Sequence, residues 1–357
     1  MGETDDSVNC EWLPERRKTL RRTAPLLLLG LLIFGAYLYF FVDIPEMINT
    51  IQQIDILYYL LAISVLLLNM VAYSLTWQSF LRTLSIKVHF TKTLLISWVG
   101  TFVEFFVPSE AIGEDVCKSY FMTKESGENT GKVVASVMGQ RIMSLLVTLI
   151  FLVVCSISWI LLQYEIPPTV SVLILLVSVG IAIPLVFLLL LCKKERLSQK
   201  LINLLLRFCV WISRGRLNSD SLRTKTENAL KSFHQSINLL SKNPTSLVLP
   251  MLFSLASFFL SVLVSYFVFV SLGYSVSFIL LVIVYSLSRS LQSVPTMLPG
   301  EVGFIEIVMT SLYIALLGPQ AAAISAAATV LTRVLWVWLR LPLGFVALHW
   351  LMHKGLL

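Results

Sequence analysis

The sequence carries few charges for its length and lacks the short motifs of common soluble enzymes. Only 13% of its 357 residues are charged, whereas 57% are hydrophobic and the mean hydropathy is +0.84. It contains no glycine-rich phosphate loop and no dinucleotide-binding fingerprint, so no nucleotide cofactor is predicted. This composition excludes a soluble globular domain and predicts a polytopic membrane protein.

Cysteine and histidine are too scattered to indicate a metal centre. The five cysteines form no CxxC pair, so neither a disulfide framework nor a zinc site is predicted. His349 and His353 have the i, i+4 spacing of two ligands on one helix face. They lie beside Trp350 and Lys354, so anchoring at the membrane interface is the better interpretation. We expect no metal and no cofactor.

The hydrophobic runs predict an all-α protein of the cell membrane with both termini in the cytoplasm. A basic cluster precedes the run 24–42, which is long enough to cross the ~30 Å hydrocarbon core and has no cleavage site after it. The following loop, 43–55, carries acidic residues but no Lys or Arg, as expected of an outside loop. About six full spans are expected, over residues 24–42, 56–80, 133–162, 169–192, 247–272 and 321–348.

Two further apolar segments are interrupted by proline, glycine and carboxylates. The first, 93–107, leads into Pro108, Glu110, Gly113 and Glu114. The second joins the runs 278–298 and 304–317 through Pro299, Gly300, Glu301, Gly303 and Glu306. Opened backbone is tolerated at membrane depth only inside protein or beside a watery cavity. We therefore predict two re-entrant hairpins, the alternative for the second being a loop outside the membrane.

The two interrupted segments correspond to each other. Each is followed by a spanning helix that carries an arginine, Arg141 or Arg333, and 141 − 114 and 333 − 306 both equal 27. The predicted topology makes the first hairpin enter from the cytoplasm and the second from outside. Matching interrupted segments in halves of opposite orientation indicate the midplane site of a transporter. An inverted repeat is therefore a hypothesis for this chain.

At these residues the sequence resembles the transmembrane, flippase-like domain of lysylphosphatidylglycerol synthases and its stand-alone relatives. The resemblance rests on two Pro–Gly–Glu motifs with a following arginine, and it extends from about residue 56 to residue 348. The matching residues are Pro108, Gly113, Glu114 and Arg141, then Pro299, Gly300, Gly303, Glu306 and Arg333. Two positions depart from the family pattern, because Glu301 replaces a glycine and Lys118 stands one position after the usual arginine.

The resemblance implies a flippase-like membrane domain. The family's soluble aminoacyl-transfer domain does not occur before Leu357, so we do not expect lysyl transfer from a charged tRNA. The expected organisation is a cytoplasmic tail (1–23), a transmembrane domain (24–350) with a basic insertion (193–245), and a C-terminal tail (351–357).

Charged residues at membrane depth form the candidate site. Arg141, Arg289 and Arg333 are expected to bind a lipid phosphate, because guanidinium binds phosphate bidentately and stays charged. Four glutamates are candidates for neutralising the arginines, contacting a headgroup or carrying a coupling proton: Glu110, Glu114, Glu301 and Glu306. The candidate hinge residues are Pro108, Gly113, Pro299, Gly300 and Gly303. The alternative is that Arg141–Glu114 and Arg333–Glu306 are static buried ion pairs.

The polar segment 193–242 is predicted to lie at the inner membrane surface. Eleven Lys and Arg against three acidic residues give it a net charge of +8. Apolar residues recur at helical spacing on both sides of an expected turn at 214–218. This pattern is typical of two amphipathic helices whose basic face meets anionic headgroups, and a plain cytoplasmic loop is the alternative.

Three functions are consistent with these features. A flippase would move a modified phospholipid or a polyprenyl-phosphate-linked sugar across the bilayer. An integral-membrane transferase would modify such a lipid with a glutamate as general base, although the sequence lacks a DxD-type metal pair and a sizeable catalytic domain. A non-transporting protein would dock a separate lipid-modifying enzyme through residues 193–242. We expect the flippase, which is not an enzyme, with membrane lipids and no nucleic acid as partners.

Overall fold

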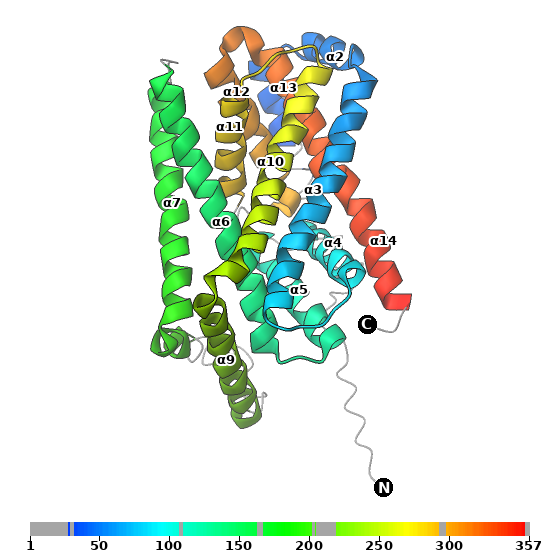
Figure 1. Ribbon diagram of the computed structural model, residues 1–357. Helices are drawn as coiled ribbons and strands as arrows, with labels where there is room; N and C mark the ends of the chain where they lie inside the picture. Colours follow the sequence, from blue (N-terminus) through cyan, green and yellow to red (C-terminus); the bar gives the residue numbers. More distant parts are fainter. Residues whose placement is uncertain are drawn as a thin grey trace.

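The computed structural model describes residues 28, 32–106, 110–162, 167–201, 204, 219–292 and 298–353. In these ranges the chain is an all-α membrane protein (Figure 1). Five helices are long and apolar enough to cross a membrane, or six if the bent pair Leu32–Phe41 and Ile44–Gln52 is one span. This number agrees with the predicted six.

The five long spans follow the hydrophobic runs. They are α3 (Ile56–Thr83), α6 (Thr130–Leu161), α7 (Pro168–Lys193), η1 with α10 (Pro244–Leu247 and Val248–Ser271), and a composite segment. The composite segment consists of η3 (Pro319–Ala321), α13 (Ala322–Arg333), the π-helical η4 (Val334–Leu339) and α14 (Arg340–His353). Helix starts are set by local sequence: the side chains of Asp55 and Asn129 accept hydrogen bonds from the first turns of α3 and α6.

The segment after the first apolar run is a helix, so the predicted loop at 43–55 was wrong. The chain bends by 101° after Leu32–Phe41 and continues as α2 (Ile44–Gln52). The carboxylate of Asp43 accepts a hydrogen bond from the backbone N–H of Glu46, so it caps α2. Small side chains of α13 pack against this bend: Ala323, Ala326 and Ala327 lie in one hydrophobic cluster with Phe34, Leu38 and Met47.

Two shorter helix pairs lie toward opposite ends of the molecule (Figure 1). The pair α4 (Phe90–Phe106) and α5 (Glu110–Ser126) lies in the lower half, at the end that also carries α9. The pair α11 (Phe278–Leu291) and α12 (Phe304–Leu317) lies in the upper half, near α2. Arg289 is in the last turn of α11, which ends at Leu291 although the apolar run continues to residue 298. The helix is shorter because prolines follow at positions 295 and 299, and proline disfavours helical backbone before it.

The second predicted amphipathic helix is present as α9 (Ser219–Lys242). It packs against the beginning of α6, where Gly131 lies so close to Ala229 and Phe233 that a Cβ atom would overlap their backbone. Residues 195–201 are helical, but the rest of the first predicted amphipathic helix and the turn at 214–218 lie outside the described residues, residue 204 excepted.

Two hydrophobic clusters hold the bundle together. The larger one joins α3, α6, α7, α10, α11, α12 and the α13–η4 segment, and includes Leu66, Phe269 and Tyr313. The smaller one joins the end of α3 to α4, α5, the start of α6 and α14, and includes Trp77 and Met122.

Candidate functional site: a polar cavity inside the helix bundle

Three adjoining compartments share Glu104 of α4 and Arg289 of α11, and together we call them the central cavity. The α12 compartment, about 90 Å³, lies among α4, α11, η2 (Pro299–Glu301), α12 and the α13–α14 segment. The α3 compartment, about 50 Å³, lies among α3, α4, α6, α10 and α11. The α7 compartment, about 600 Å³, lies among α6, α7 and α11.

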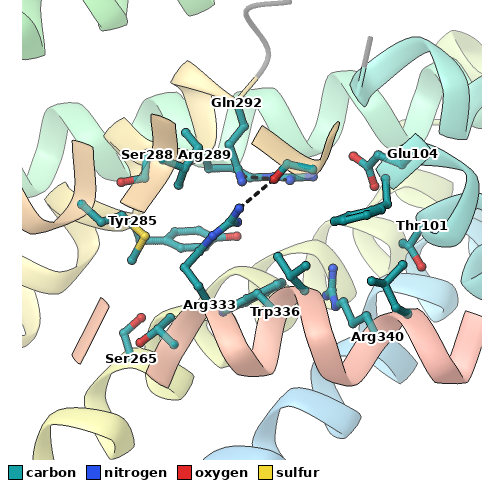
Figure 2. A pocket seen from close by; sticks show the side chains of 17 residues that line it. Thr101, Glu104, Ser265, Tyr285, Ser288, Arg289, Gln292, Arg333, Trp336 and Arg340 are labelled. Atoms are coloured by element: carbon teal, nitrogen blue, oxygen red, sulfur yellow. Dashed lines mark hydrogen bonds between the residues drawn. The ribbon is translucent and has the colours of Figure 1, made fainter. Parts of the chain in front are cut away.

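All three predicted arginines line the central cavity, although they come from different helices. Arg289 borders every compartment, Arg333 borders the α12 compartment and Arg141 borders the α7 compartment. Figure 2 shows Arg289 and Gln292 on one wall of the α12 compartment, with Arg333 on the helix opposite. The Arg289 guanidinium donates a hydrogen bond to Gln292 Oε1 at 3.3 Å. The structure therefore brings together charges that lie far apart in the sequence.

In the second motif, Arg333 connects α13 to the start of α12. Its Nε donates to Glu306 Oε1 at 2.7 Å, and its Nη2 donates to the Gly300 carbonyl at 2.8 Å. The other carboxylate oxygen of Glu306 accepts the backbone N–H of Gly303 at 2.7 Å. Glu306 lies in the first turn of α12, where the helix dipole favours a carboxylate. The Arg333–Glu306 ion pair, which was the alternative to a phosphate-binding role for Arg333, is present, and both side chains are buried.

The backbone of the second motif needs glycine. Gly300 and Gly303 have φ values of +57° and +92°, a region that side chains with a Cβ rarely adopt. A Cβ at Gly300 would also overlap the ring of Phe105 on α4. Both observations confirm the predicted need for glycine. Glu301 has a positive φ of 53° as well and is buried, so this turn is held by its surroundings.

In the first motif, Glu114 is bound by Lys118 rather than by Arg141. Lys118 is one helical turn further along α5, and its ammonium makes an ion pair with the Glu114 carboxylate. Tyr73 donates a hydrogen bond to the same carboxylate at 3.0 Å, and Lys118 donates to Gln140 Oε1 at 3.3 Å. Glu114 and Lys118 are 1% and 0% exposed. Among the described residues Arg141 makes no ion pair with Glu114, so this half of the static-pair alternative is not formed.

The remaining predicted residues are less informative. Gly113 lies inside the first turn of α5 with helical backbone, so it forms no bend. Pro299 begins η2. Pro108 lies outside the described residues, as do the side chains of Glu110 and Pro299.

The sequence reasoning missed two residues of the cavity, Glu104 and Arg340. Glu104 lies within the apolar run 93–107, where an ionisable group was itself a signal of function. Arg340 lies within the last expected span, 321–348. It lines two compartments, its guanidinium carbon lies 4.2 Å from the Trp336 ring centre, and its Nη2 donates to Asn69 Oδ1 at 3.2 Å. The π-helical η4 between Arg333 and Arg340 alters their angular relation, so a regular helical projection does not place Arg340.

An all-α membrane bundle around an interior cavity lined by arginine and glutamate defines a polytopic membrane protein with a buried polar site. The chain belongs to the lysylphosphatidylglycerol synthase TM region family, whose model matches residues 27–344. It is similar to a UPF0104 membrane protein of Pyrococcus horikoshii, with 26% identity over 309 residues, 84% of this chain and 89% of that one. A UPF0104 membrane protein of Methanothermobacter thermautotrophicus is 24% identical over 330 residues, 91% of this chain and 94% of that one. The predicted family membership is confirmed.

Proposed function

We propose that this protein is a lipid flippase, which moves a phospholipid or a polyprenyl-phosphate-linked sugar across the bilayer. The observation that carries the proposal is the joining of a charged site to an apolar space. Arg141, Arg289, Gln292 and Glu104 lie at the polar end of the α7 compartment. The α7 wall of the same compartment is apolar: Leu173, Leu176, Val177, Gly180, Ile181, Pro184, Phe187 and Leu188. The headgroup of a lipid would bind at the arginines, and its hydrocarbon chain would lie along the apolar wall formed by α7.

The dimensions of the α7 compartment fit a lipid chain. Leu173 and Leu188 are fifteen residues apart, which is ~22 Å along a helix. That length is more than half of the ~30 Å hydrocarbon core, so the α7 wall is long enough to cover a lipid chain that spans one leaflet. Hydrophobic side chains elsewhere on α7, such as Leu175 and Ile183, are exposed, as expected of a helix that faces lipid. A lipid could therefore reach the compartment from the bilayer.

The two short helix pairs provide a basis for alternating access. In this proposal α4–α5 is a re-entrant hairpin from the cytoplasmic side and α11–α12 is one from outside, as an inverted repeat requires. The hairpins contact each other beside the cavity, where Gly300 lies against Phe105. Rocking of one pair against the other would open the central cavity to each face in turn. Glu104, Glu114 and Glu301 are the candidates for carrying a coupling proton.

The basic helix α9 would face the cytoplasm and meet anionic headgroups there. Its exposed lysine Lys231 and the C-terminal Lys242 lie at the same end of the molecule as α5 (Figure 1). Anionic lipids attract such basic segments at the inner leaflet. A separate lipid-modifying enzyme that binds there is a further partner consistent with this surface.

Reconstitution in liposomes tests the proposal. Purified protein would be incorporated with fluorescent phosphatidylglycerol, phosphatidylethanolamine or polyprenyl phosphate, and the exposed fraction of the probe measured with a membrane-impermeant quencher. We expect at least one of these lipids to exchange between leaflets without chemical change. Arg289→Gln should abolish the exchange, because this residue borders all three compartments.

Arg82→Gln is the matched control, since Arg82 is an exposed arginine at the end of α3, away from the cavity. Its exchange rate should equal that of the wild type. Exchange that persists in Arg289→Gln would contradict the assigned site. Formation of a modified lipid product in the liposomes would instead show a transferase.

A further inference from the structure

The α12 compartment contains polar groups that the protein itself leaves without hydrogen bonds. Three polar atoms border it and make no hydrogen bond to any described residue: Ser288 Oγ, Thr332 Oγ1 and Arg340 Nε. Ser288 is 5% exposed and Thr332 2% exposed, so bulk water reaches neither of them easily. A buried polar group without a partner lowers the stability of the protein, so three in one compartment indicate a ligand that supplies acceptors.

The charges of the α12 compartment favour an anion. Arg333 is already bound to Glu306 and to the Gly300 carbonyl, so its guanidinium is used in holding the second motif. Arg340 makes one hydrogen bond within the described part of the chain, to Asn69. Arg289 and Arg340 border the same compartment, and their like charges act on each other. The lining of this compartment contains three arginines, Arg289, Arg333 and Arg340, and one carboxylate, Glu104, so an anion is favoured over a cation there.

The position of Arg340 is fixed before any ligand binds. Its guanidinium lies over the face of Trp336, at 4.2 Å from the ring centre. The side-chain amide of Asn69 accepts the Arg340 hydrogen bond and is itself held by donation to the Ser257 carbonyl at 2.7 Å and to Ser261 Oγ at 2.9 Å. Figure 2 shows Arg340 and Trp336 on one wall and Arg289 and Ser288 on the opposite wall. Such preorganisation reduces the entropy lost on binding.

We propose that the α12 compartment is a phosphate-binding subsite, in which Arg340 and Arg289 hold one singly charged phosphodiester and the hydroxyls of Ser288 and Thr332 donate to it. Arg333 acts on this subsite only by holding the Gly300 turn in place. The inference rests on the proposed function for the choice of a lipid as the source of the phosphate. Its chemistry requires only an anion with several acceptor oxygens, which guanidinium and hydroxyl groups recognise together.

Equilibrium binding to the purified full-length protein tests the subsite without measuring transport. The probes are dioctanoyl phosphatidylglycerol, dioctanoylglycerol, which lacks the phosphate, and inorganic phosphate. We expect phosphatidylglycerol to bind most tightly. Arg340→Gln should weaken its binding by at least about tenfold, because a hydrogen bond to a charged group contributes roughly 1.5–3 kcal/mol. Arg82→Gln, the same change at an exposed site, should leave it unchanged.

Three results would overturn the proposal. Unchanged affinity in a folded Arg340→Gln protein would remove Arg340 from the site. Equal binding of dioctanoylglycerol would show that no phosphate is recognised. Inorganic phosphate that binds as tightly as phosphatidylglycerol would make free phosphate the ligand and exclude the lipid.

If Arg340→Gln does not fold, a structure of the wild type with phosphatidylglycerol decides the matter. The lipid phosphate should contact Arg340 and Arg289, and a phosphate bound elsewhere would contradict the subsite. If phosphatidylglycerol binds in the α12 compartment but no lipid exchanges between leaflets in liposomes, the flippase is disproved and the subsite is retained. If lipid exchanges between leaflets but its phosphate does not bind in the α12 compartment, the flippase is retained and the subsite is disproved.

Discussion

At the scale of single residues, the arginines of the cavity divide by what they already contact. Arg333 gives hydrogen bonds to Glu306 and Gly300, and it is 7% exposed. Arg289 borders all three compartments and is only half-buried. Arg333 therefore holds the second motif together, whereas Arg289 is placed where a ligand in any of the three compartments would meet it.

Substitutions of the two arginines should accordingly lower the thermal stability of the protein by different amounts. Arg333→Gln leaves Glu306 buried without its counter-charge, which costs about 3–5 kcal/mol. Thermal unfolding in detergent should show a clear loss for Arg333→Gln and a smaller one for Arg289→Gln. In a double-mutant cycle, Arg333→Gln combined with Glu306→Gln should cost at least about 1 kcal/mol less than the sum of the single changes. Additive effects would mean that the ion pair does not couple α13 to α12.

At the scale of elements, the Gly300 turn is the point where the two helix pairs touch. It permits close contact between η2 and Phe105 of α4 because glycine has neither a Cβ nor a barrier to positive φ. Arg333 also holds this turn, because its Nη2 donates a hydrogen bond to the Gly300 carbonyl. The contact thus combines backbone geometry, steric fit and charge at one position.

Gly300→Ala should disturb this contact more than a turn glycine elsewhere. The control is Gly273→Ala, because Gly273 also has a positive φ, of +71°, but open space around it. Both changes carry the backbone penalty of about 1–2 kcal/mol, and only Gly300→Ala adds the overlap with Phe105. Phe105→Ala in the Gly300→Ala background should restore part of the lost thermal stability. Equal destabilisation by the two alanines would show that the contact is unimportant.

At the scale of the whole molecule, the helix pairs, α2 and α9 define two distinct ends. α9, whose sequence has four Lys and Arg against two acidic residues, lies at one end, and α2 with its acidic cap Asp43 lies at the opposite end (Figure 1). Positive charge is retained on the cytoplasmic side of membrane proteins. The α9 end should therefore face the cytoplasm, with the α2 end outside.

Thiol labelling in intact cells checks this orientation. In a variant without the five native cysteines, Lys231→Cys on α9 should react with an impermeant maleimide only after the membrane is permeabilised. Gln53→Cys, just after α2, is the control and should react in intact cells, because both positions are exposed in the protein. The opposite pattern would reverse the orientation and with it the proposed entry sides of the two hairpins.

The sequence by itself determined the membrane class, the spans, the family and most of the charged residues of the site. These depend on local properties: the length of an apolar run fixes a span, proline and glycine break a helix, and an arginine at membrane depth must be accommodated inside the bundle. The bounds of α12, the requirement for glycine at positions 300 and 303, and the Arg333–Glu306 pair followed from such local signals.

Only the tertiary structure decided which groups meet. It paired Glu114 with Lys118 and not with Arg141, it brought Arg340 into the cavity, and it formed the α7 compartment from α6, α7, α11 and Glu104 of α4. It also turned the expected loop after the first apolar run into α2. The physical reason is that pairing and cavity shape depend on which helix faces pack together, and on the π-helical turn before Arg340, whereas periodicity in one segment specifies neither.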